Sequence, residues 1–122
     1  MCTKTELQKI TQTVVQSVLE LLESKIYKIV LYGSYARGDF DAESDVDIII
    51  LLDCDEKELR NYRKRVAVLA SRISLENDIE ASLLLKNRNF FEDRRAILPF
   101  YQNIENEGVV LYGESDEGTF KI

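Results

Sequence analysis

The chain has no histidine among its 122 residues and only two cysteines, Cys2 and Cys54. Without histidine it cannot use a Ser-His triad, a histidine general base or a His-ligated zinc ion. The two cysteines lack the spacing of a metal site, and a disulfide framework is not expected from them. Any catalysis must therefore rest on carboxylates, lysines, arginines, hydroxyls and metal ions.

Long apolar runs and a positive charge balance are also missing. No run approaches the roughly 20 residues that span a bilayer, and residues 1–6 carry no signal-peptide hydrophobic stretch, so we expect a cytoplasmic protein. The formal net charge is −6, whereas proteins that grip a nucleic-acid backbone usually carry a basic face. The acidic balance favours a small nucleotide delivered with magnesium, or a protein partner, over nucleic acid.

The hydrophobic pattern predicts one domain over residues 1–113 and a C-terminal tail over 114–122. Strand and helix periods alternate along the chain, which indicates an α/β (α+β) fold with a small mixed sheet packed by helices. The expected helices cover residues 4–24, 34–37 (a single turn), 55–75 and 97–106, and the expected strands cover 26–32, 46–53, 79–86 and, as a short strand or turn, 108–113.

A small-residue turn and two carboxylates stand at a fixed distance along the sequence. Gly33 and Ser34 follow the first predicted strand, and ten residues separate Ser34 from Asp45. Glycine lets a backbone approach an anion closely, and the serine offers a hydroxyl and an N–H group. Asp45 and Asp47 alternate at the start of the next strand, so their side chains should share a face and converge on one metal ion or on a pair.

Each signal has a structural explanation when it is taken alone. A Gly-Ser turn usually only connects a strand to a helix, and an Asp-x-Asp pair often only begins a strand. Asp47, however, interrupts a run of apolar residues, where an unpaired carboxylate is costly unless a cation compensates it. The combination therefore predicts a site for phosphate and magnesium.

Two further residues are candidates for this site. Glu80 interrupts the third apolar strand, so it is either a third metal ligand and general base or a solvent-facing glutamate. Arg37 lies three residues after Ser34, and it could bind phosphate or pair with Asp39, Asp41 or Asp45.

These motifs carry a family resemblance. The segments LYGSYARGD (residues 31–39) and SDVDI (residues 44–48) resemble the signature of the DNA polymerase beta-like nucleotidyltransferase superfamily, in particular its minimal nucleotidyltransferase (MNT) group. The resemblance implies an MgATP-type donor, with Ser34 on the phosphates, beside Gly33, and Asp45 and Asp47 as ligands of two Mg²⁺ ions. The family often has an aspartate on the third strand, where this chain offers Glu80.

Enzymes of this group commonly pair with a small helical HEPN protein, so the resemblance implies an antitoxin that attaches AMP to a hydroxyl of a HEPN toxin. Two alternatives remain: adenylylation of a small molecule such as an aminoglycoside, or a binding module without turnover. A Glu80 that points away from Asp47 would favour the binding module. Phe90, Phe91, Phe100 and Tyr101 should mostly be core, with some left for a helical partner or a homodimer.

Overall fold

The computed structural model describes residues 4–22, 25–41 and 43–113. The predicted tail at 114–122 lies outside the described residues. Within these ranges no helix has the length and apolar character that crossing a membrane requires, and the cytoplasmic location stays a prediction. The elements are α1 (Lys4–Leu22), β1 (Ile26–Tyr32), α2 (Ser34–Arg37), β2 (Val46–Leu52), α3 (Glu56–Asn77), β3 (Ala81–Asn87), α4 (Arg88–Arg94), α5 (Pro99–Glu107) and β4 (Val109–Tyr112).

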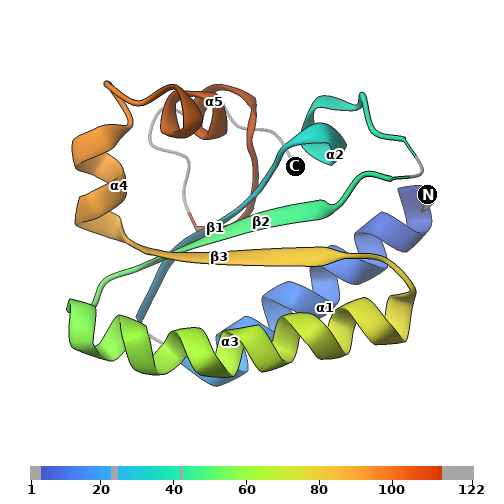
Figure 1. Cartoon of the computed structure of the whole chain (residues 1–122), viewed down its shortest axis with the longest axis horizontal. Helices are drawn as coiled ribbons and strands as arrows, with labels where there is room; N and C mark the ends of the chain where they lie inside the picture. Colours follow the sequence, from blue (N-terminus) through green and yellow to red (C-terminus); the bar gives the residue numbers. More distant parts are fainter. Residues whose placement is uncertain (1–3, 23–24, 42, 114–122) are drawn as a thin grey trace.

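The strands form one mixed sheet in the order β3-β2-β1-β4 (Figure 1). β1 runs antiparallel to β2 and to β4, whereas β2 and β3 are parallel. The parallel pair is possible because α3 carries the chain back along the sheet between the two strands. The predicted fold class is confirmed.

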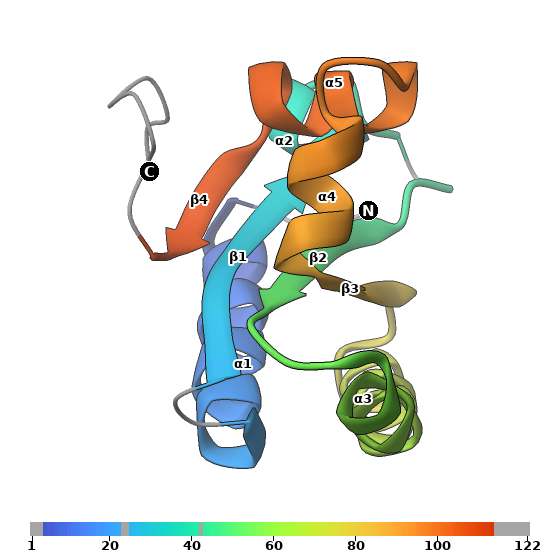
Figure 2. The ribbon, with the colours of Figure 1, turned by 90° about the vertical axis from the view of Figure 1, so that its left-hand side faces the viewer.

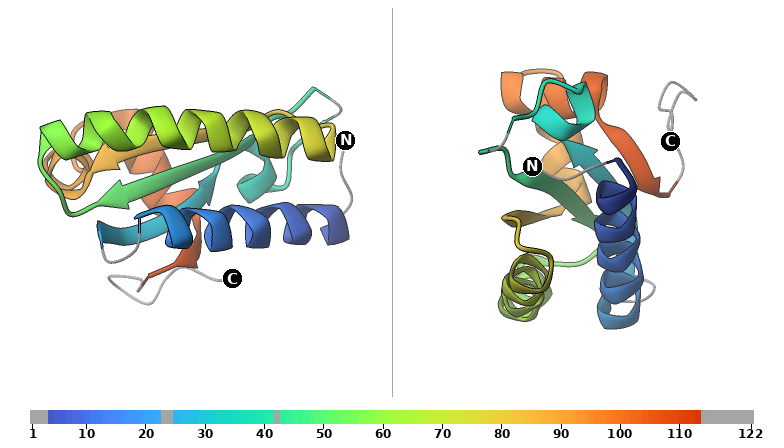
Figure 3. Two further views of the ribbon diagram at one scale, coloured as in Figure 1. Left: turned by 90° about the horizontal axis from the view of Figure 1, so that it is seen from below. Right: turned by 90° about the vertical axis from the view of Figure 1, so that its right-hand side faces the viewer.

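Helices α1 and α3 cover one face of the sheet (Figures 1 and 3). Their buried residues recur every three to seven positions, which is the spacing of one helical stripe. These residues are Ile10, Val14, Val18 and Leu22 in α1 and Leu59, Val66, Leu69 and Ile73 in α3. They pack against alternate residues of the central strands, including Ile29, Ile48 and Ile50, to form the larger core.

Helices α4 and α5 cover part of the other face (Figure 2). Phe91 of α4 and Tyr101 of α5 are buried there against Val30 and Ile49, so the two central strands are covered on both sides. Phe90 is half-buried, and the Phe100 side chain is 46% exposed. The expectation that most of these aromatic residues are core therefore holds for two of the four.

The structure differs from the predicted elements mainly around β3. The strand starts at Ala81, two residues later than predicted, because Ile79 still belongs to the turn that leaves α3 at Asp78, where φ is 51°. Helix α4 was not predicted. Its seven residues are too few to show a helical period, and the side chain of Asn87 begins it by accepting a hydrogen bond from the Asn89 N–H at 2.8 Å.

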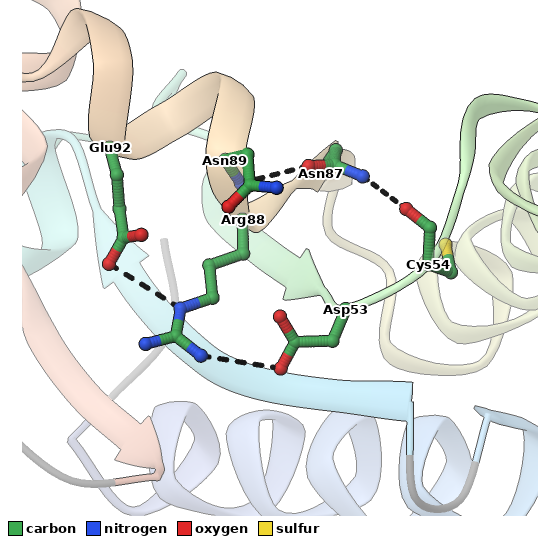
Figure 4. Close-up of polar contacts among 6 residues, drawn as sticks. All are labelled: Asp53, Cys54, Asn87, Arg88, Asn89 and Glu92. Carbon is green, nitrogen blue, oxygen red and sulfur yellow. Dashed lines mark hydrogen bonds and ion pairs between the residues drawn. The ribbon is translucent and has the colours of Figure 1, made fainter.

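The start of α4 is tied to the end of β2 by polar contacts (Figure 4). The Asn87 amide donates to the backbone carbonyl of Cys54. The Arg88 guanidinium lies between the carboxylates of Asp53, at 3.6 Å, and Glu92, at 3.4 Å. These contacts fix α4 across the end of the sheet at which β2 and β3 finish.

Candidate functional site

Asp45 and Asp47 lie at the opposite end of β2, where the strand begins. Asp47 is half-buried as the second residue of β2, and Asp45 precedes the strand and is exposed. Alternation places both side chains on one face, with Cα atoms roughly 6.5–7 Å apart. Tyr32 of β1 pairs with Asp47 of β2, and Tyr32 packs against the core beneath α4 and α5. Asp45 and Asp47 therefore lie on the face of the sheet that α4 and α5 partly cover.

The loop that delivers Asp45 is held against α2. The ring of Phe40 stacks on Tyr35 at 4.4 Å between centroids and 15° between planes. The Asp41 carboxylate accepts from the Glu43 N–H at 2.9 Å, and the Asp41 N–H donates to the Ser44 hydroxyl oxygen at 2.9 Å. This local turn sets the direction in which the chain enters β2.

At Gly33 the turn that follows β1 lies beside the Asp47 carboxylate of β2. Its φ of 77° and ψ of −157° lie in a region that is essentially reserved for glycine. A Cβ built on Gly33 would lie 2.5 Å from Oδ2 of Asp47, so the position also has no room for a side chain. The backbone of the turn and the carboxylate of β2 therefore meet at this glycine.

Ser34 opens α2 directly after Gly33 and is half-buried. The first N–H groups of a helix have no intrahelical partner, so they can meet an anion together with the hydroxyl. The helix ends after one turn, because Gly38 has a φ of 86° and its N–H donates to the Ser34 carbonyl at 2.8 Å. The single helical turn predicted over residues 34–37 is confirmed.

Arg37 points its guanidinium at two carboxylates beside the turn. Its Nε lies 3.1 Å from Oδ2 of Asp39 and 3.7 Å from Oε2 of Glu107 on α5. The hydrogen bond that Arg37 donates to Asp39 raises the pKa of Arg37, and the charges of Asp39, Glu107 and Asp47 add to this. Of the partners predicted from sequence, Asp39 pairs with Arg37, and Glu107 was not foreseen.

The two aspartates are left without a cation among the described residues. No described side chain forms an ion pair or hydrogen bond with either carboxylate. Burial raises the pKa of Asp47, the charge of Asp45 raises it further, and Arg37 offsets part of this. A half-buried carboxylate beside a like charge is costly, and a metal ion that binds both aspartates would offset this cost.

Glu80 lies one residue before β3, and its backbone carbonyl accepts from the Val46 N–H at 2.9 Å. The register of β2 with β3 pairs Val46 with Ala81, and continuing it by one residue towards the start of both strands places Glu80 beside Asp45. Glu80 is exposed, and across the part of the chain that the structure describes, no three acidic or cysteine side chains converge as a metal site. The sheet thus brings Glu80 next to the pair in register without completing a three-carboxylate cluster.

This donor set fits Mg²⁺ as half of a site. Magnesium is usually held by one or two carboxylates, with phosphate oxygens and water completing its octahedron. Asp45 and Asp47 would supply the carboxylates, and the backbone of Gly33 lies close to the Asp47 carboxylate.

Sequence reasoning missed the residues that surround the turn. Burial, followed by the charges of Asp47 and Tyr101, raises the pKa of Tyr32 to about 12, so this phenol stays neutral beside Asp47. Helix α5 adds Phe100, Asn103 and Glu107, which line a pocket with Tyr32 and Arg37. The helical spacing of these α5 residues was visible in the sequence, but nothing there indicated that α5 packs beside Gly33.

Comparison with known proteins agrees with this geometry. Residues 12–111 match the model of the nucleotidyltransferase domain family. Two proteins of Methanocaldococcus jannaschii, each named as a candidate protein adenylyltransferase, are 33% identical over 104 residues and 31% identical over 105 residues. These matches cover 85% and 86% of this chain and 97% of each relative.

Solved structures share the fold at low identity. A toxin–antitoxin complex with AMP-PNP matches with a TM-score of 0.59 and 19% identity, and a variant of the toxin–antitoxin MntA–HpeT matches with 0.57 and 18%. Each match covers 88% of this chain and 77% of the other. Since the family match runs from α1 to β4 and includes the turn and both aspartates, the chain belongs to the nucleotidyltransferase domain family and is a nucleotidyltransferase.

Proposed function

We propose that this chain transfers AMP from MgATP to a hydroxyl group of a partner protein, and that it acts as the antitoxin of a HEPN-type helical toxin. The close approach of Gly33 to the Asp47 carboxylate is the main support for this proposal, because it places the candidate phosphate-binding turn beside a candidate metal ligand. The adenylyltransferase names of the relatives and the toxin–antitoxin complexes among the structural matches support the choice of acceptor and partner.

Each residue of the site has a role in this proposal. Asp45 and Asp47 hold two divalent ions, which supply charge neutralisation at the phosphates when they are bound. Gly33 and Ser34 bind the triphosphate through backbone N–H groups and the hydroxyl. Arg37 adds positive charge on the same side, held in place by Asp39 and Glu107.

The acceptor approaches from the β3 side. Its hydroxyl oxygen attacks the α-phosphorus of ATP in line with the bond to the bridging oxygen of the β-phosphate. That bond breaks and pyrophosphate leaves, while the hydroxyl proton passes to the Glu80 carboxylate, which acts as general base. Glu80 suits this role because the register places it beside Asp45, at the side of the pair away from the Gly33 turn.

The connection between α4 and α5 offers a contact for the partner. Ile97 is 72% exposed and Leu98 is 42% exposed on this connection, beside the half-open ring of Phe100. Exposed apolar side chains that lie close together commonly mark interaction surfaces. The same surface could serve a homodimer, and the oligomeric state in solution separates the two uses.

Intact-mass analysis tests the proposed function. The purified chain is incubated with ATP, Mg²⁺ and a candidate HEPN-type helical protein, and the mass of that protein is followed. We expect one or more AMP additions to the partner, none in EDTA and none with the Asp45→Asn/Asp47→Asn double variant. A stable complex without AMP addition would favour a binding module, and AMP on an aminoglycoside instead would favour a small-molecule acceptor.

A further inference from the structure

A pocket of about 160 Å³ opens directly beside the phosphate turn. Tyr32 and Gly33 at the end of β1 form its floor, and Arg37 of α2 forms one wall. The other wall is one face of α5, with its residues spaced three and four apart: Phe100, Asn103, Ile104 and Glu107. Figure 1 shows α2 and α5 on the same side of the sheet, near the end of β1.

The walls combine a flat apolar surface with hydrogen-bonding groups. The Phe100 ring is 46% exposed, and it is held edge-on to Tyr32 at 5.7 Å and 90° and close to Tyr101 at 5.2 Å. A ring fixed on one side and open on the other is a stacking surface for a planar heterocycle. The exposed Asn103 amide can both donate and accept hydrogen bonds at the edge of such a ring.

The size and charge of the pocket argue against a phosphate group as its occupant. It is smaller than the roughly 300–1,000 Å³ of sites that enclose a whole drug-sized ligand, so it suits one ring system. The Glu107 carboxylate, which shares Arg37 with Asp39, would repel a phosphate, whereas an uncharged base can lie beside it.

We infer that this pocket, between α2 and α5, binds the nucleobase of the donor nucleotide, with Phe100 as the stacking surface and Asn103 reading the edge of the base. The inference rests on the proposed function, because the phosphates must lie on Gly33 and Ser34 for the base to reach α5. If the base binds here, α5 distinguishes a nucleotide from a polyphosphate that lacks the base, although α5 lies outside the sequence motif.

Calorimetry with two ligands tests this assignment. Mg²⁺-ATP and Mg²⁺-tripolyphosphate, which lacks ribose and base, are titrated into the full chain and its variants. We expect Phe100→Leu and Asn103→Ala to weaken Mg²⁺-ATP binding, by between about 5- and 100-fold for Phe100→Leu, and to leave tripolyphosphate binding unchanged. Asn103→Ala lies on an exposed helix position and replaces a weak helix former, so it keeps the test valid if Phe100→Leu perturbs folding.

Matched controls come from outside the pocket. Tyr112→Leu removes another aromatic ring that is 39% exposed, and Asn106→Ala removes another exposed amide of α5. Both controls should bind both ligands as the wild type does. The inference would be overturned if the pocket variants weakened the binding of both ligands equally, or weakened the binding of neither. It would also be overturned if they slowed only the transfer step at saturating ATP. In each of these cases the proposed function would stand. A wild-type chain that binds neither ligand would overturn the proposed function itself.

Discussion

The two ends of β2 carry carboxylates in opposite circumstances. Asp53, just after the strand, faces Arg88 at 3.6 Å, and the same guanidinium lies 3.4 Å from Glu92 (Figure 4). The guanidinium also lies 3.8 Å from the centre of the Tyr27 ring. Asp45 and Asp47, at the start of the strand, have no such cation among the described residues. One end is thus neutralised within the chain, and the other keeps its negative charge for a ligand.

This difference separates structural carboxylates from functional ones. An acidic residue with a partner in the same chain holds two elements together, as Asp53 does for the end of β2 and α4. A half-buried acid with a raised pKa and a like-charged neighbour is a cost to the fold, which Arg37 offsets in part and a bound cation would relieve further. Substitutions at the two ends of β2 should therefore differ in their effects on nucleotide binding and on stability.

The largest effect is expected for Asp47→Asn. Asn keeps the shape of the side chain but loses the charge that holds the metal ions, so transfer should fall by at least about 100-fold, since metal stabilisation is worth several kcal/mol. The rate of AMP transfer measures this. A variant that retains the wild-type rate would show that Asp47 is not a metal ligand in the transfer reaction.

The same variant should be more stable than the wild type without metal. Because the pKa of Asp47 is raised in the fold, folding favours its protonated form, and the wild-type free energy of unfolding falls as the pH rises from the ordinary value of 3.8 through the raised pKa. The side chain in Asp47→Asn does not ionise, so the free energy of unfolding of this variant does not fall in this way. Its Tm in EDTA at pH 7 should therefore exceed that of the wild type, and a lower Tm would show that the carboxylate stabilises the fold.

Gly33→Ala should damage the site more than the fold. The new Cβ would overlap Oδ2 of Asp47, and the positive φ adds strain of about 1–3 kcal/mol, so we expect loss of MgATP binding together with a lower Tm. Gly38→Ala is the matched control, because Gly38 also has a positive φ but open space around it. It should lower the Tm while leaving MgATP binding intact. Equal binding losses in both variants would indicate backbone strain alone.

Ser34→Ala should have a smaller effect. It removes one hydroxyl from the phosphate turn, and a hydrogen bond to a charged group is worth about 1.5–3 kcal/mol, so MgATP binding should weaken by roughly 10- to 150-fold with little change in Tm. Unchanged affinity in calorimetry would show that the Gly-Ser segment serves only as a turn.

The smallest effect is expected at the other end of β2. Asp53→Asn removes an exposed partner of Arg88, and exposed ion pairs contribute little, so the Tm should fall only slightly and MgATP affinity should not change. A loss of affinity comparable to that of Ser34→Ala would show that the two ends are coupled through the sheet.

Much of this architecture could be predicted from the sequence because it depends on local signals. The apolar run predicts the strand β1, Gly33 predicts the turn at its end, and the Asp-x-Asp pair predicts where β2 begins. The partners of Arg37 and the pocket on α5 could not be predicted, because they depend on how Glu107, some 70 residues later, packs beside the turn. The position of Glu80 depends on the register between β2 and β3, which no short sequence pattern sets.

We expect the start of β2, with Asp45 and Asp47, to be a metal-dependent nucleotide site. Calorimetric titration of ATP into the wild-type chain and into Asp47→Asn, each with Mg²⁺ and with EDTA, tests it most directly. We predict ATP binding by the wild type that requires Mg²⁺ and is lost in the variant. Equal ATP affinity for both proteins, with or without Mg²⁺, would contradict the claim.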